Sequence, residues 1–323
     1  MRILIVKTSS LGDLFHALPA VHLLKAAMDA EIDWVVNTQY VGLAECFSDV
    51  RKVIPFPRQG LISNLGAFRA ELRKETYDLV VDLQGLLKSA LICRMAKRAK
   101  RAEILGPSFQ REGARFFYSA VVGKKNKQRH AVEENLDVLR FLGKPDFPVE
   151  FPIRFPDVDF QCLEKKPVVV FAPCSRHAAK NWPWKRFVEL GEHLDCQVIL
   201  VGAPTDVETC EKIENHLPEG ACTNLCGKTS LLELGGVLQR ADLVVTVDSG
   251  PMHMASAAGT PCLAIFGPTD PTRVGPFGDQ HRVVRVSGVR TYSKQDLDSI
   301  RMVKAIDVIQ TAKGMLNDET VGL

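Results

Sequence analysis

Residues 243–259 read LVVTVDSGPMHMASAAG: a β-branched apolar run, a polar turn with glycine and proline, and then a run of small residues. This order predicts a buried strand, a tight turn and a closely packed helix. The free N–H groups and the positive dipole end of that helix suit a diphosphate. The candidate ligand-binding residues in the turn are Asp248, Ser249, Gly250 and His253. In the alternative interpretation, the aspartate and the serine cap the helix and the histidine is buried in the core.

Two more turns of this kind follow apolar runs in the same half of the chain. The run Val168–Ala172 leads into PCSRHAAKNWP, where Ser175 offers a hydroxyl and Lys180 a positive charge to a phosphate. The run Cys262–Phe266 leads into GPTDP. Because parallel strands end at the same edge of a sheet, the three turns together predict one anion-binding edge.

The N-terminal half begins with the same arrangement. The run Arg2–Lys7 leads into TSSLGD (8–13), and a helical spacing of apolar residues continues to Met28. Small residues in that turn let the backbone approach a ligand, and Asp13 supplies a carboxylate where the helix is expected to begin. Taken alone, Asp13 would be a helix N-cap. Pro19 predicts either a kink or the first regular turn of that helix.

Strand and helix patterns alternate through both halves, which predicts parallel sheets with helices on both faces. The first half gives strands at Arg2–Lys7, Ile32–Val36, Val53–Phe56, Leu79–Leu83 and Glu103–Leu105, and helices at Leu14–Met28, Gly66–Lys74 and Leu86–Ala96. The second half gives strands at Val168–Ala172, Gln197–Val201, Leu243–Val247 and Cys262–Phe266, and helices at Pro183–Leu194, Val207–His216, Leu231–Gln239, Met252–Ala258 and Lys294–Lys313.

The segment 144–167, KPDFPVEFPIRFPDVDFQCLEKKP, separates the two halves. Its prolines exclude a regular helix or a central strand, so we predict an extended linker. A chain of 323 residues is long enough for two domains of ordinary size. The predicted architecture is therefore α/β, with two Rossmann-like parallel-sheet domains, 1–156 and 157–323, facing a cleft.

The composition, with 46% hydrophobic and 24% charged residues, is that of a globular protein. No apolar run approaches the roughly 18 residues of a membrane span. The apolar stretch Ile3–Val6 is too short for a signal-peptide core, so we expect a cytoplasmic protein. The nine cysteines are scattered, and the close pair Cys222 and Cys226 lacks a second pair, so no metal site is expected.

Positive charge is concentrated in the first half. Residues 1–156 hold 24 Lys and Arg against 17 Asp and Glu, whereas residues 157–323 hold 17 against 21. Between Lys88 and Arg129 there are 12 basic residues and only two acidic ones. A basic run is usually a solvated surface, but this excess indicates an anionic partner: a phosphorylated lipid, an acidic sugar or a nucleic acid. No nucleic-acid-binding motif accompanies the charge, so we expect no nucleic acid, which a gel shift with salt titration would test.

Two common nucleotide-binding motifs are missing from the sequence. There is no G-x-G-x-x-G fingerprint of the usual dinucleotide-binding domain. The tripeptide Gly227-Lys228-Thr229 looks like the end of a P-loop, but the glycine required five residues before Gly227 is replaced by Cys222. Neither motif therefore explains the phosphate-compatible turns.

The turns lie in segments that together resemble the heptosyltransferases of lipopolysaccharide inner-core assembly, an inverting glycosyltransferase family with the two-domain GT-B fold. The resemblance runs almost end to end and rests on VKTSSLGDLFHALPA (6–20), DLQGLLKSA (82–90), KNWP (180–183), VGAPTD (201–206), VDSGPMHMASA (247–257) and FGPTDP (266–271). The chain is most similar to the members that add the first heptose to Kdo on lipid A. The fold of these relatives also implies that the last helix can cross back to the N-terminal domain.

The resemblance assigns roles to individual residues. Asp13 matches the catalytic base, and the donor-site residues are Ser175, Lys180, Asp206, Thr229, Asp248, Ser249, Gly250 and His253. The residues that match acceptor-facing positions are Ser10, Gly12, Lys88, Arg111 and His130. The chain departs from the family pattern at three donor positions. Asp206 stands where we expect a glutamate for the ribose, Thr229 where we expect a methionine near the adenine, and Ser175 where we expect a threonine.

The resemblance implies an inverting, metal-independent transfer of L-glycero-D-manno-heptose from ADP-heptose to Kdo-lipid A, with no cofactor. It also implies a monomer that is cytoplasmic and contacts the cytoplasmic face of the inner membrane peripherally. One alternative is heptosyltransferase II or another member with a different sugar donor or acceptor, which a substrate panel would distinguish. Another is a non-catalytic nucleotide-sugar-binding protein, which would bind ADP without transferring a sugar.

Overall fold

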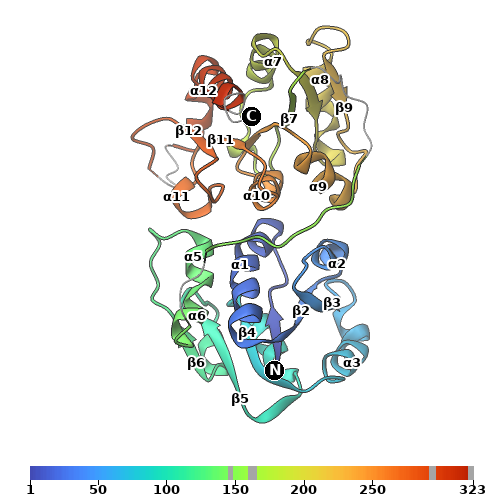
Figure 1. Cartoon of the computed structure of the whole chain (residues 1–323), viewed down its shortest axis with the longest axis vertical. Helices are drawn as coiled ribbons and strands as arrows, with labels where there is room; N and C mark the ends of the chain where they lie inside the picture. The colour runs from blue at the N-terminus through green and yellow to red at the C-terminus, as the bar shows by residue number, and fades with distance from the viewer. Residues whose placement is uncertain (145–147, 159–165, 291–295, 319–323) are drawn as a thin grey trace. The chain divides into compact units, whose positions relative to one another are not determined.

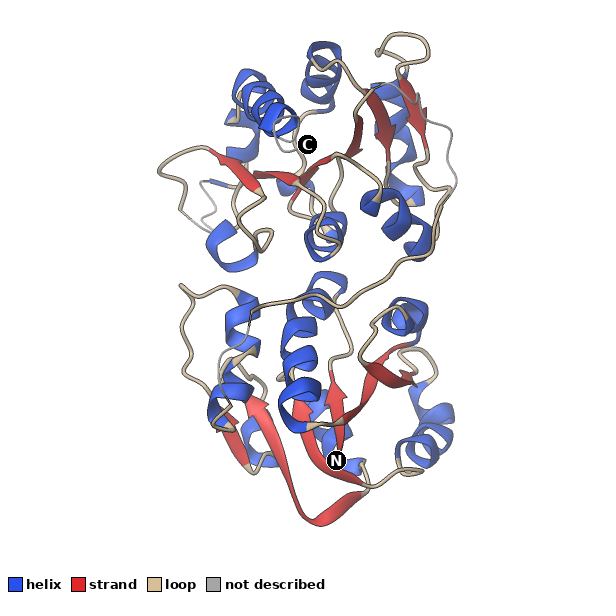
Figure 2. Cartoon of the chain, in the orientation of Figure 1, coloured by secondary structure: helices blue, strands red, loops and turns tan. Residues whose placement is uncertain are grey.

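The computed structural model describes residues 1–144, 148–158, 166–290 and 296–318. The chain divides into two compact units, Met1–Arg154 and Phe155–Leu323 (Figure 1). Each unit contains one six-stranded sheet in which all neighbouring strands run parallel. In each unit helices surround the sheet (Figure 2). The predicted α/β class with two Rossmann-like parallel sheets is therefore confirmed.

The first unit alternates strands with helices in the order that the sequence predicts. Its elements are β1 (Arg2–Val6), α1 (Leu11–Met28), β2 (Glu31–Asn37), η1 (Thr38–Tyr40), α2 (Val41–Glu45), β3 (Val50–Phe56), α3 (Leu61–Leu72), β4 (Tyr77–Asp82), α4 (Leu87–Met95), β5 (Arg98–Pro107), η2 (Ala114–Phe117), β6 (Ala120–Val122), α5 (Ala131–Asn135) and α6 (Asp137–Phe141).

The strand order of the first sheet is β3-β2-β1-β4-β5-β6. The chain therefore reverses its direction of winding between β1 and β4, and ligands bind outside the carboxyl ends of strands at such a switch point. Alternate residues of β1 face opposite sides of the sheet: Leu4 and Val6 join the core under α3 and α4. On the other face, the rings of Phe15, Trp34 and Phe47 pack together.

The second unit repeats this organisation. Its elements are β7 (Val168–Ala172), η3 (Ala178–Lys180), α7 (Trp184–His193), β8 (Gln197–Leu200), η4 (Pro204–Asp206), α8 (Val207–Glu214), β9 (Cys222–Asn224), α9 (Leu231–Gln239), β10 (Leu243–Val247), α10 (Gly250–Ala257), β11 (Cys262–Phe266), α11 (Pro271–Val274), β12 (Arg282–Arg285), η6 (Ser299–Met302) and α12 (Ala305–Asp318).

The strand order of the second sheet is β12-β11-β10-β7-β8-β9, so its switch point lies between β7 and β10. Both strands are buried along their whole length, which explains their continuous β-branched sequences. One face carries α7, α8 and α12 over a single apolar core, and α9 and α10 pack against each other elsewhere in the unit. The three turns singled out by the sequence thus follow neighbouring strands.

The predicted helix over 294–313 is wrong in its bounds. Residues 294 and 295 lie outside the described part, and the chain then forms η6 and, after an extended Val303, the helix α12. The break has a physical cause, because the Val303 carbonyl accepts hydrogen bonds from the Trp182 and Arg186 side chains. The buried residues of α12 join the core of the second unit, where the helix packs on α7, β10, β11 and β12.

The helix α1 also begins earlier than predicted. It starts at Leu11 and continues through Pro19 to Met28, so Pro19 does not begin its regular part. The edge strands β6, β9 and β12 were not predicted; they have only three, three and four residues. In the linker, the described residues form no helix or strand, apart from an isolated bridge between Ile153 and Phe47. None of the described helices combines the length and apolarity that crossing a bilayer requires.

Candidate functional site

The switch point of the second sheet holds a buried ion pair. The Nζ atom of Lys180, in the turn after β7, lies 2.7 Å from a carboxylate oxygen of Asp248, the first residue after β10. The Asp248 side chain is 7% exposed and that of Lys180 is 22% exposed, so the carboxylate is buried and the lysine side chain remains partly accessible. The sequence predicted both residues at this edge; only the structure shows that they bind each other.

Two hydrogen bonds fix the turn after β7. The Asn181 side chain accepts a hydrogen bond from the Ser175 backbone N–H at 2.7 Å, which closes the turn around Lys180. The next residue, Trp182, is buried and donates its indole N–H to the Val303 carbonyl at 3.0 Å. Burial raises the pKa of the neighbouring Cys174 thiol to about 12, and the charge of Asp206 adds to this shift. The cysteine in this turn therefore stays a neutral thiol.

The turn after β10 ends in the first residues of α10. Ser249 is the N-cap and Gly250 and Pro251 open the helix, so free backbone N–H groups lie at this end. The hydroxyl of Thr246 donates to the Ala172 carbonyl at 3.1 Å and lies 3.2 Å from the Ser249 hydroxyl, which ties β10 to β7. His253 lies on the first turns of α10 and is half-buried. Ser249 thus holds the N-cap position, but its side chain makes no capping hydrogen bond, which leaves the N–H groups beside it open to an anion.

Asp206 and Thr229 belong to the neighbouring loops after β8 and β9. The Asp206 carboxylate accepts from the Ala203 N–H at 2.9 Å, within its own short helix η4. The Gly227 N–H donates to the Gly202 carbonyl at 2.9 Å, which joins the two loops beside the half-buried Thr229. These candidate donor residues therefore sit at the same edge as the ion pair, one and two strands away.

The turn after β11 completes this edge. Asp270 caps α11 by accepting from the Thr272 N–H at 3.0 Å. The Thr269 hydroxyl is buried and makes no hydrogen bond within the part of the chain that the structure describes. A buried hydroxyl without a partner is uncommon in proteins. Thr269 is therefore an additional candidate for ligand contact. The sequence had assigned no role to any residue of this turn, GPTDP.

In the first unit, Asp13 is held by the residue before the helix. A carboxylate oxygen of Asp13 accepts hydrogen bonds from both the N–H and the hydroxyl of Ser10, each at 2.8 Å. Ser10 is thus the N-cap of α1 and Asp13 its third residue, so the alternative interpretation of Asp13 as the cap itself is wrong. Asp13 is half-buried and Gly12 beside it is buried. The carboxylate is positioned at the carboxyl edge of β1, as predicted.

Gln84, which the sequence analysis missed as a site residue, organises the same turn. Its side-chain oxygen accepts from the backbone N–H groups of Thr8 at 3.0 Å and Ser9 at 3.1 Å. The buried Lys7 ammonium donates to the Leu83 carbonyl at 2.6 Å, so the turns after β1 and β4 are joined twice. The sequence did contain a signal for this role, because Gln84 follows a buried strand in the segment DLQGLLKSA (82–90).

A buried carboxylate anchors the turn after β4. Asp82 accepts from the N–H groups of Gln84 and Gly85 and from the hydroxyls of Ser89 and Tyr118, at 2.7–3.0 Å. Burial raises its pKa, and the hydrogen bonds from Gly85 and Ser89 oppose the rise. All four donors are satisfied locally, so Asp82 shapes the turn that carries Gln84 and the start of α4.

Two of the predicted basic residues lie at this edge. Lys88, on the first turn of α4, is exposed and its Nζ atom lies 5.4 Å from the centre of the Phe56 ring at the end of β3. Arg111 has an exposed side chain, and its N–H donates to the Gly85 carbonyl at 2.8 Å. Both cations therefore surround the switch point of the first sheet.

His130 lies at the start of α5. Its Nδ1 atom accepts from the Val132 N–H at 3.1 Å, so this nitrogen caps the helix. Its ring packs edge-to-face against His16 of α1, with ring centres 5.4 Å apart. Because His16 lies three residues after Asp13, the contact places His130 beside the helix that carries the carboxylate.

The structure thus gathers the predicted residues into two groups, one on each unit. Asp13, Ser10, Gly12, Lys88, Arg111 and His130 belong to the first, and the eight donor-site candidates belong to the second. Within the described residues, no group of three or more His, Cys, Asp or Glu side chains is arranged to hold a metal ion.

Comparison with known families gives one match: the model described as "Glycosyltransferase family 9 (heptosyltransferase)" covers residues 65–302. Among curated proteins, the chain is 33% identical to lipopolysaccharide heptosyltransferase 1 of Escherichia coli O18:K1:H7 over 89% of this chain and 92% of that relative. It is 30% identical to lipooligosaccharide heptosyltransferase 2 of Haemophilus influenzae over 88% of this chain and 89% of the relative.

Solved structures give a consistent result. E. coli heptosyltransferase WaaC, solved with ADP-2-deoxy-2-fluoro heptose, matches with a TM-score of 0.77 and 29% identity, over 97% of this chain and 99% of that one. E. coli ADP-heptose lps heptosyltransferase II matches in fold with a TM-score of 0.80 at 24% identity, over 99% of this chain and 100% of that one.

Proposed function

The chain belongs to glycosyltransferase family 9, the heptosyltransferases, and we propose that it transfers L-glycero-D-manno-heptose from ADP-heptose to Kdo of lipid A in lipopolysaccharide inner-core synthesis. The observation that carries the donor part is the Lys180–Asp248 pair beside the first turn of α10. The similarity to heptosyltransferase 1 along most of the chain supports the choice of acceptor.

In this proposal the second unit binds the donor. The ammonium of Lys180 and the free N–H groups of α10 bind the diphosphate and stabilise the charge that develops on it as the sugar leaves. Asp248 orients Lys180 through their 2.7 Å contact. The loops after β8 and β9, with Asp206 and Thr229, bind the nucleoside, and Ser175, Ser249, Gly250 and His253 complete the site.

The first unit binds the acceptor and supplies the base. A sugar hydroxyl is a weak nucleophile at neutral pH, and Asp13 accepts its proton as the oxygen attacks the anomeric carbon of the heptose. ADP departs from the opposite face with the bonding electrons, so the configuration at that carbon inverts. Ser10 holds the Asp13 carboxylate in place, and Gly12 lies between them in the same turn. Lys88, Arg111 and His130 bind the acidic acceptor.

A transfer assay tests this function. The purified chain is incubated with ADP-heptose and Kdo-lipid A, ADP release is followed, and the product is analysed by mass spectrometry. We expect ADP release that depends on the acceptor, and a product heavier by one heptose. ADP binding without any transfer would contradict the proposal and support a non-catalytic binding protein.

A second candidate function is transfer to an acceptor that already carries one heptose. The 30% identity to a heptosyltransferase 2 supports this second candidate. In the same assay, a product formed only from the heptosylated acceptor would select this candidate.

We also propose that the protein works as a monomer on the cytoplasmic side of the inner membrane, which it contacts peripherally. The lipid nature of the proposed acceptor supports this placement. Fractionation of cells that express the chain, followed by a salt wash of the membranes, tests the placement, and size-exclusion chromatography with light scattering tests the oligomeric state. A chain found only in the periplasm, or a stable dimer, would contradict these two statements.

A further inference from the structure

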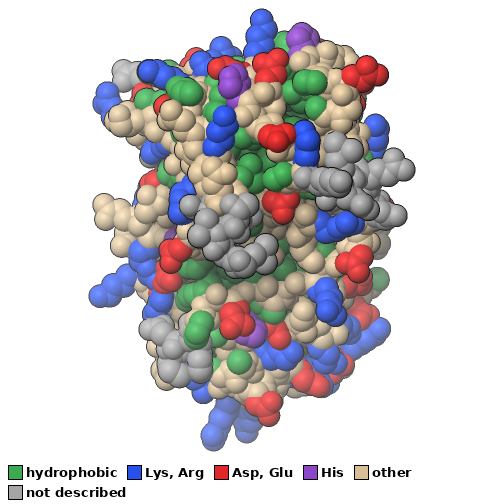
Figure 3. Space-filling model, turned by 45° about the horizontal axis from the view of Figure 1, so that its top comes forward, with side chains coloured by type: hydrophobic (Ala, Val, Ile, Leu, Met, Phe, Trp, Pro, Cys, Tyr) green, Lys and Arg blue, Asp and Glu red, His purple; other side chains and the backbone are tan. Residues whose placement is uncertain are grey.

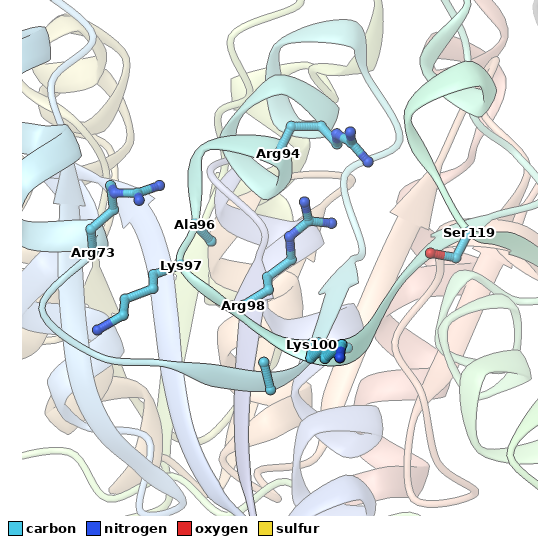
Figure 4. Close-up of a pocket in the computed structure, with 9 residues that line it drawn as sticks. Arg73, Arg94, Ala96, Lys97, Arg98, Lys100 and Ser119 are labelled. Carbon is cyan, nitrogen blue, oxygen red and sulfur yellow. The ribbon is translucent and has the colours of Figure 1, made fainter.

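A basic pocket lies on the first unit, away from the turns described above. It encloses about 500 Å³. The polar side chains that line it are Arg73, Arg94, Lys97, Arg98, Lys100 and Ser119 (Figure 4). No Asp or Glu is among the described residues that line this pocket. It is formed where α3 and α4 end and β5 begins.

The register of the sheet separates this pocket from the candidate reaction edge. Arg98, the first residue of β5, pairs with Tyr77, the first residue of β4. The site turn begins at Asp82, at the other end of β4, which is about 17 Å further along at roughly 3.3 Å per residue. The pocket therefore lies at the amino edge of the first sheet, whereas Asp13 and Gln84 lie at its carboxyl edge.

The pocket concentrates cations that have no acidic partner. None of its five Lys and Arg side chains forms a salt bridge with a described residue. Burial lowers the pKa of Arg98, and the positive charge of Arg94 adds to this shift. Arg73 donates one N–H to the Met95 carbonyl at 3.2 Å, and its other guanidinium N–H groups make no hydrogen bond to a residue that the structure describes.

Ser119 adds a hydroxyl donor to this charge. Its oxygen accepts from the Ile104 N–H at 3.0 Å, and its own proton is not used in that bond. Guanidinium, ammonium and hydroxyl donors around one space are the groups that bind a phosphate. Arg73, Arg94, Lys97 and Lys100 are exposed, so the pocket is open to a ligand from solvent.

Exposed apolar side chains lie next to the pocket. On α4, Leu91 is 44% exposed and lies one turn before Arg94 on the same side of the helix. Phe116, on the η2 turn that packs against α4, is 83% exposed. Exposed leucine and phenylalanine beside lysine and arginine are typical of surfaces that bind the interface of an anionic bilayer.

We propose that this pocket binds the phosphate group of an anionic lipid headgroup, with Leu91 and Phe116 contacting the bilayer beside it. The charge of the pocket is complementary to that headgroup, and the apolar side chains favour a lipid over a free phosphate. This proposal rests on the proposed membrane contact and specifies the surface and the ligand through which it occurs. It does not depend on sugar transfer.

The experiment measures sedimentation with vesicles of neutral phosphatidylcholine and with vesicles that also contain phosphatidylglycerol. We expect the wild type to bind only the anionic vesicles. The variant Arg94→Gln/Arg98→Gln/Lys100→Gln is expected to lose about 100- to 1,000-fold in partition, since each of the three basic residues contributes about a factor of 5 to 10 at such a surface. Leu91→Gln/Phe116→Ser is expected to lose several-fold.

The matched control is Lys124→Gln/Lys125→Gln/Lys127→Gln, which removes the same charge from an exposed loop of the same unit. We expect it to lose less than about threefold, because distant charges are screened by salt. Unchanged affinity of each variant for ADP would show that the protein remains folded and separates this test from that of the transfer reaction.

Three results would overturn the proposal. Equal losses in the pocket variant and the control would mean that the surface attracts anions without a specific site. Wild-type protein that does not bind the anionic vesicles would exclude the lipid headgroup. Unchanged binding by the Leu91→Gln/Phe116→Ser variant would exclude the apolar contact.

Discussion

The ammonium of Lys180 and the carboxylate of Asp248 lie 2.7 Å apart and join the turns that follow β7 and β10, the two central strands of the second sheet. The two residues are 68 positions apart in the sequence. Each charge compensates the other for the loss of hydration that comes with burial. The pair fixes Lys180 beside the start of α10. A diphosphate at that place meets a positioned cation and free N–H groups together.

Removing this cation is expected to affect both donor binding and stability. Lys180→Met should weaken ADP-heptose binding about 10- to 100-fold, because a charge-assisted hydrogen bond to the phosphate is lost. It should also lower the free energy of unfolding by up to about 3 kcal/mol, because Asp248 is left buried without its partner. Calorimetry with ADP-heptose and urea denaturation measure the two effects.

The double variant Lys180→Met/Asp248→Asn separates the two effects. It should regain most of the stability, since no unpaired buried charge remains, while donor affinity stays low. Lys212→Met is the control, because Lys212 forms an exposed pair with Glu208 on α8. Donor affinity unchanged in Lys180→Met would remove Lys180 from the diphosphate site.

Replacing the proposed base should stop turnover and spare the fold. In Asp13→Asn the amide oxygen still accepts from the Ser10 N–H, so the first turn of α1 keeps its cap. We expect kcat to fall by about 10² to 10⁴ with ADP affinity nearly unchanged, since only proton transfer is lost. A matched control is Glu233→Gln, because Glu233 caps α9 in the same way through the Ser230 N–H at 2.7 Å. Turnover close to that of the wild type in Asp13→Asn would exclude the base role.

Gln84 is expected to act by positioning the turn that carries Ser10 and Asp13. In Gln84→Leu the Thr8 and Ser9 N–H groups lose their acceptor, which should cost about 1–3 kcal/mol of stability and lower kcat about tenfold. ADP affinity should not change. Gln84→Glu keeps the acceptor oxygen and should restore turnover, whereas failure of this rescue would mean that the amide itself contacts substrate.

The close approach of Gly106 to Tyr118 predicts a steric effect on the Asp82 network. A Cβ at Gly106 would lie 2.1 Å from ring atoms of Tyr118, whose hydroxyl donates to Asp82 at 2.7 Å. Gly106→Ala should therefore destabilise the protein by about 1–3 kcal/mol or more in urea denaturation. Gly66→Ala is the control, because nothing lies within 4 Å of the added methyl group in α3. It should stabilise the helix by up to about 1 kcal/mol, and a similar loss in both variants would contradict the steric argument.

His281 should make stability depend on pH. Burial lowers the pKa of His281 to about 4 in the folded protein, against about 6.5 for an exposed histidine. The unfolded chain therefore binds a proton as the pH falls below about 6.5 and the folded protein does not, so stability decreases with falling pH. Between about pH 7 and about pH 5 the expected loss from this residue is about 2 kcal/mol.

Urea denaturation at the two pH values tests this. In His281→Gln the free energy of unfolding should decrease less between these pH values, by about 2 kcal/mol. In His193→Gln, which changes an exposed histidine, it should decrease as in the wild type. An equal decrease in wild type and His281→Gln would show that other groups cause the pH dependence.

Much of the fold could be predicted because its central strands are buried on both faces. The runs Val168–Ala172, Leu243–Val247 and Cys262–Phe266 are strands with the predicted bounds, and a nearly continuous apolar sequence is the pattern typical of burial on both faces. The edge strands β6, β9 and β12 were not predicted because they are short. For example, β12 reads RVVR and contains only exposed and half-buried residues. Solvent on one side of a strand removes the apolar signal.

The sequence by itself determined that the chain forms two parallel α/β sheets with polar, glycine-containing turns after particular strands. Burial patterns and turn-forming residues are properties of consecutive residues, so they can be recognised in the sequence. Only the tertiary structure decided that Lys180 binds Asp248, that Gln84 holds the turn before Asp13, and that the basic run starting at Lys97 lies at the amino edge of its sheet. These relationships depend on strand order and register, which bring together residues tens of positions apart. Such pairings leave no periodic pattern in a single chain.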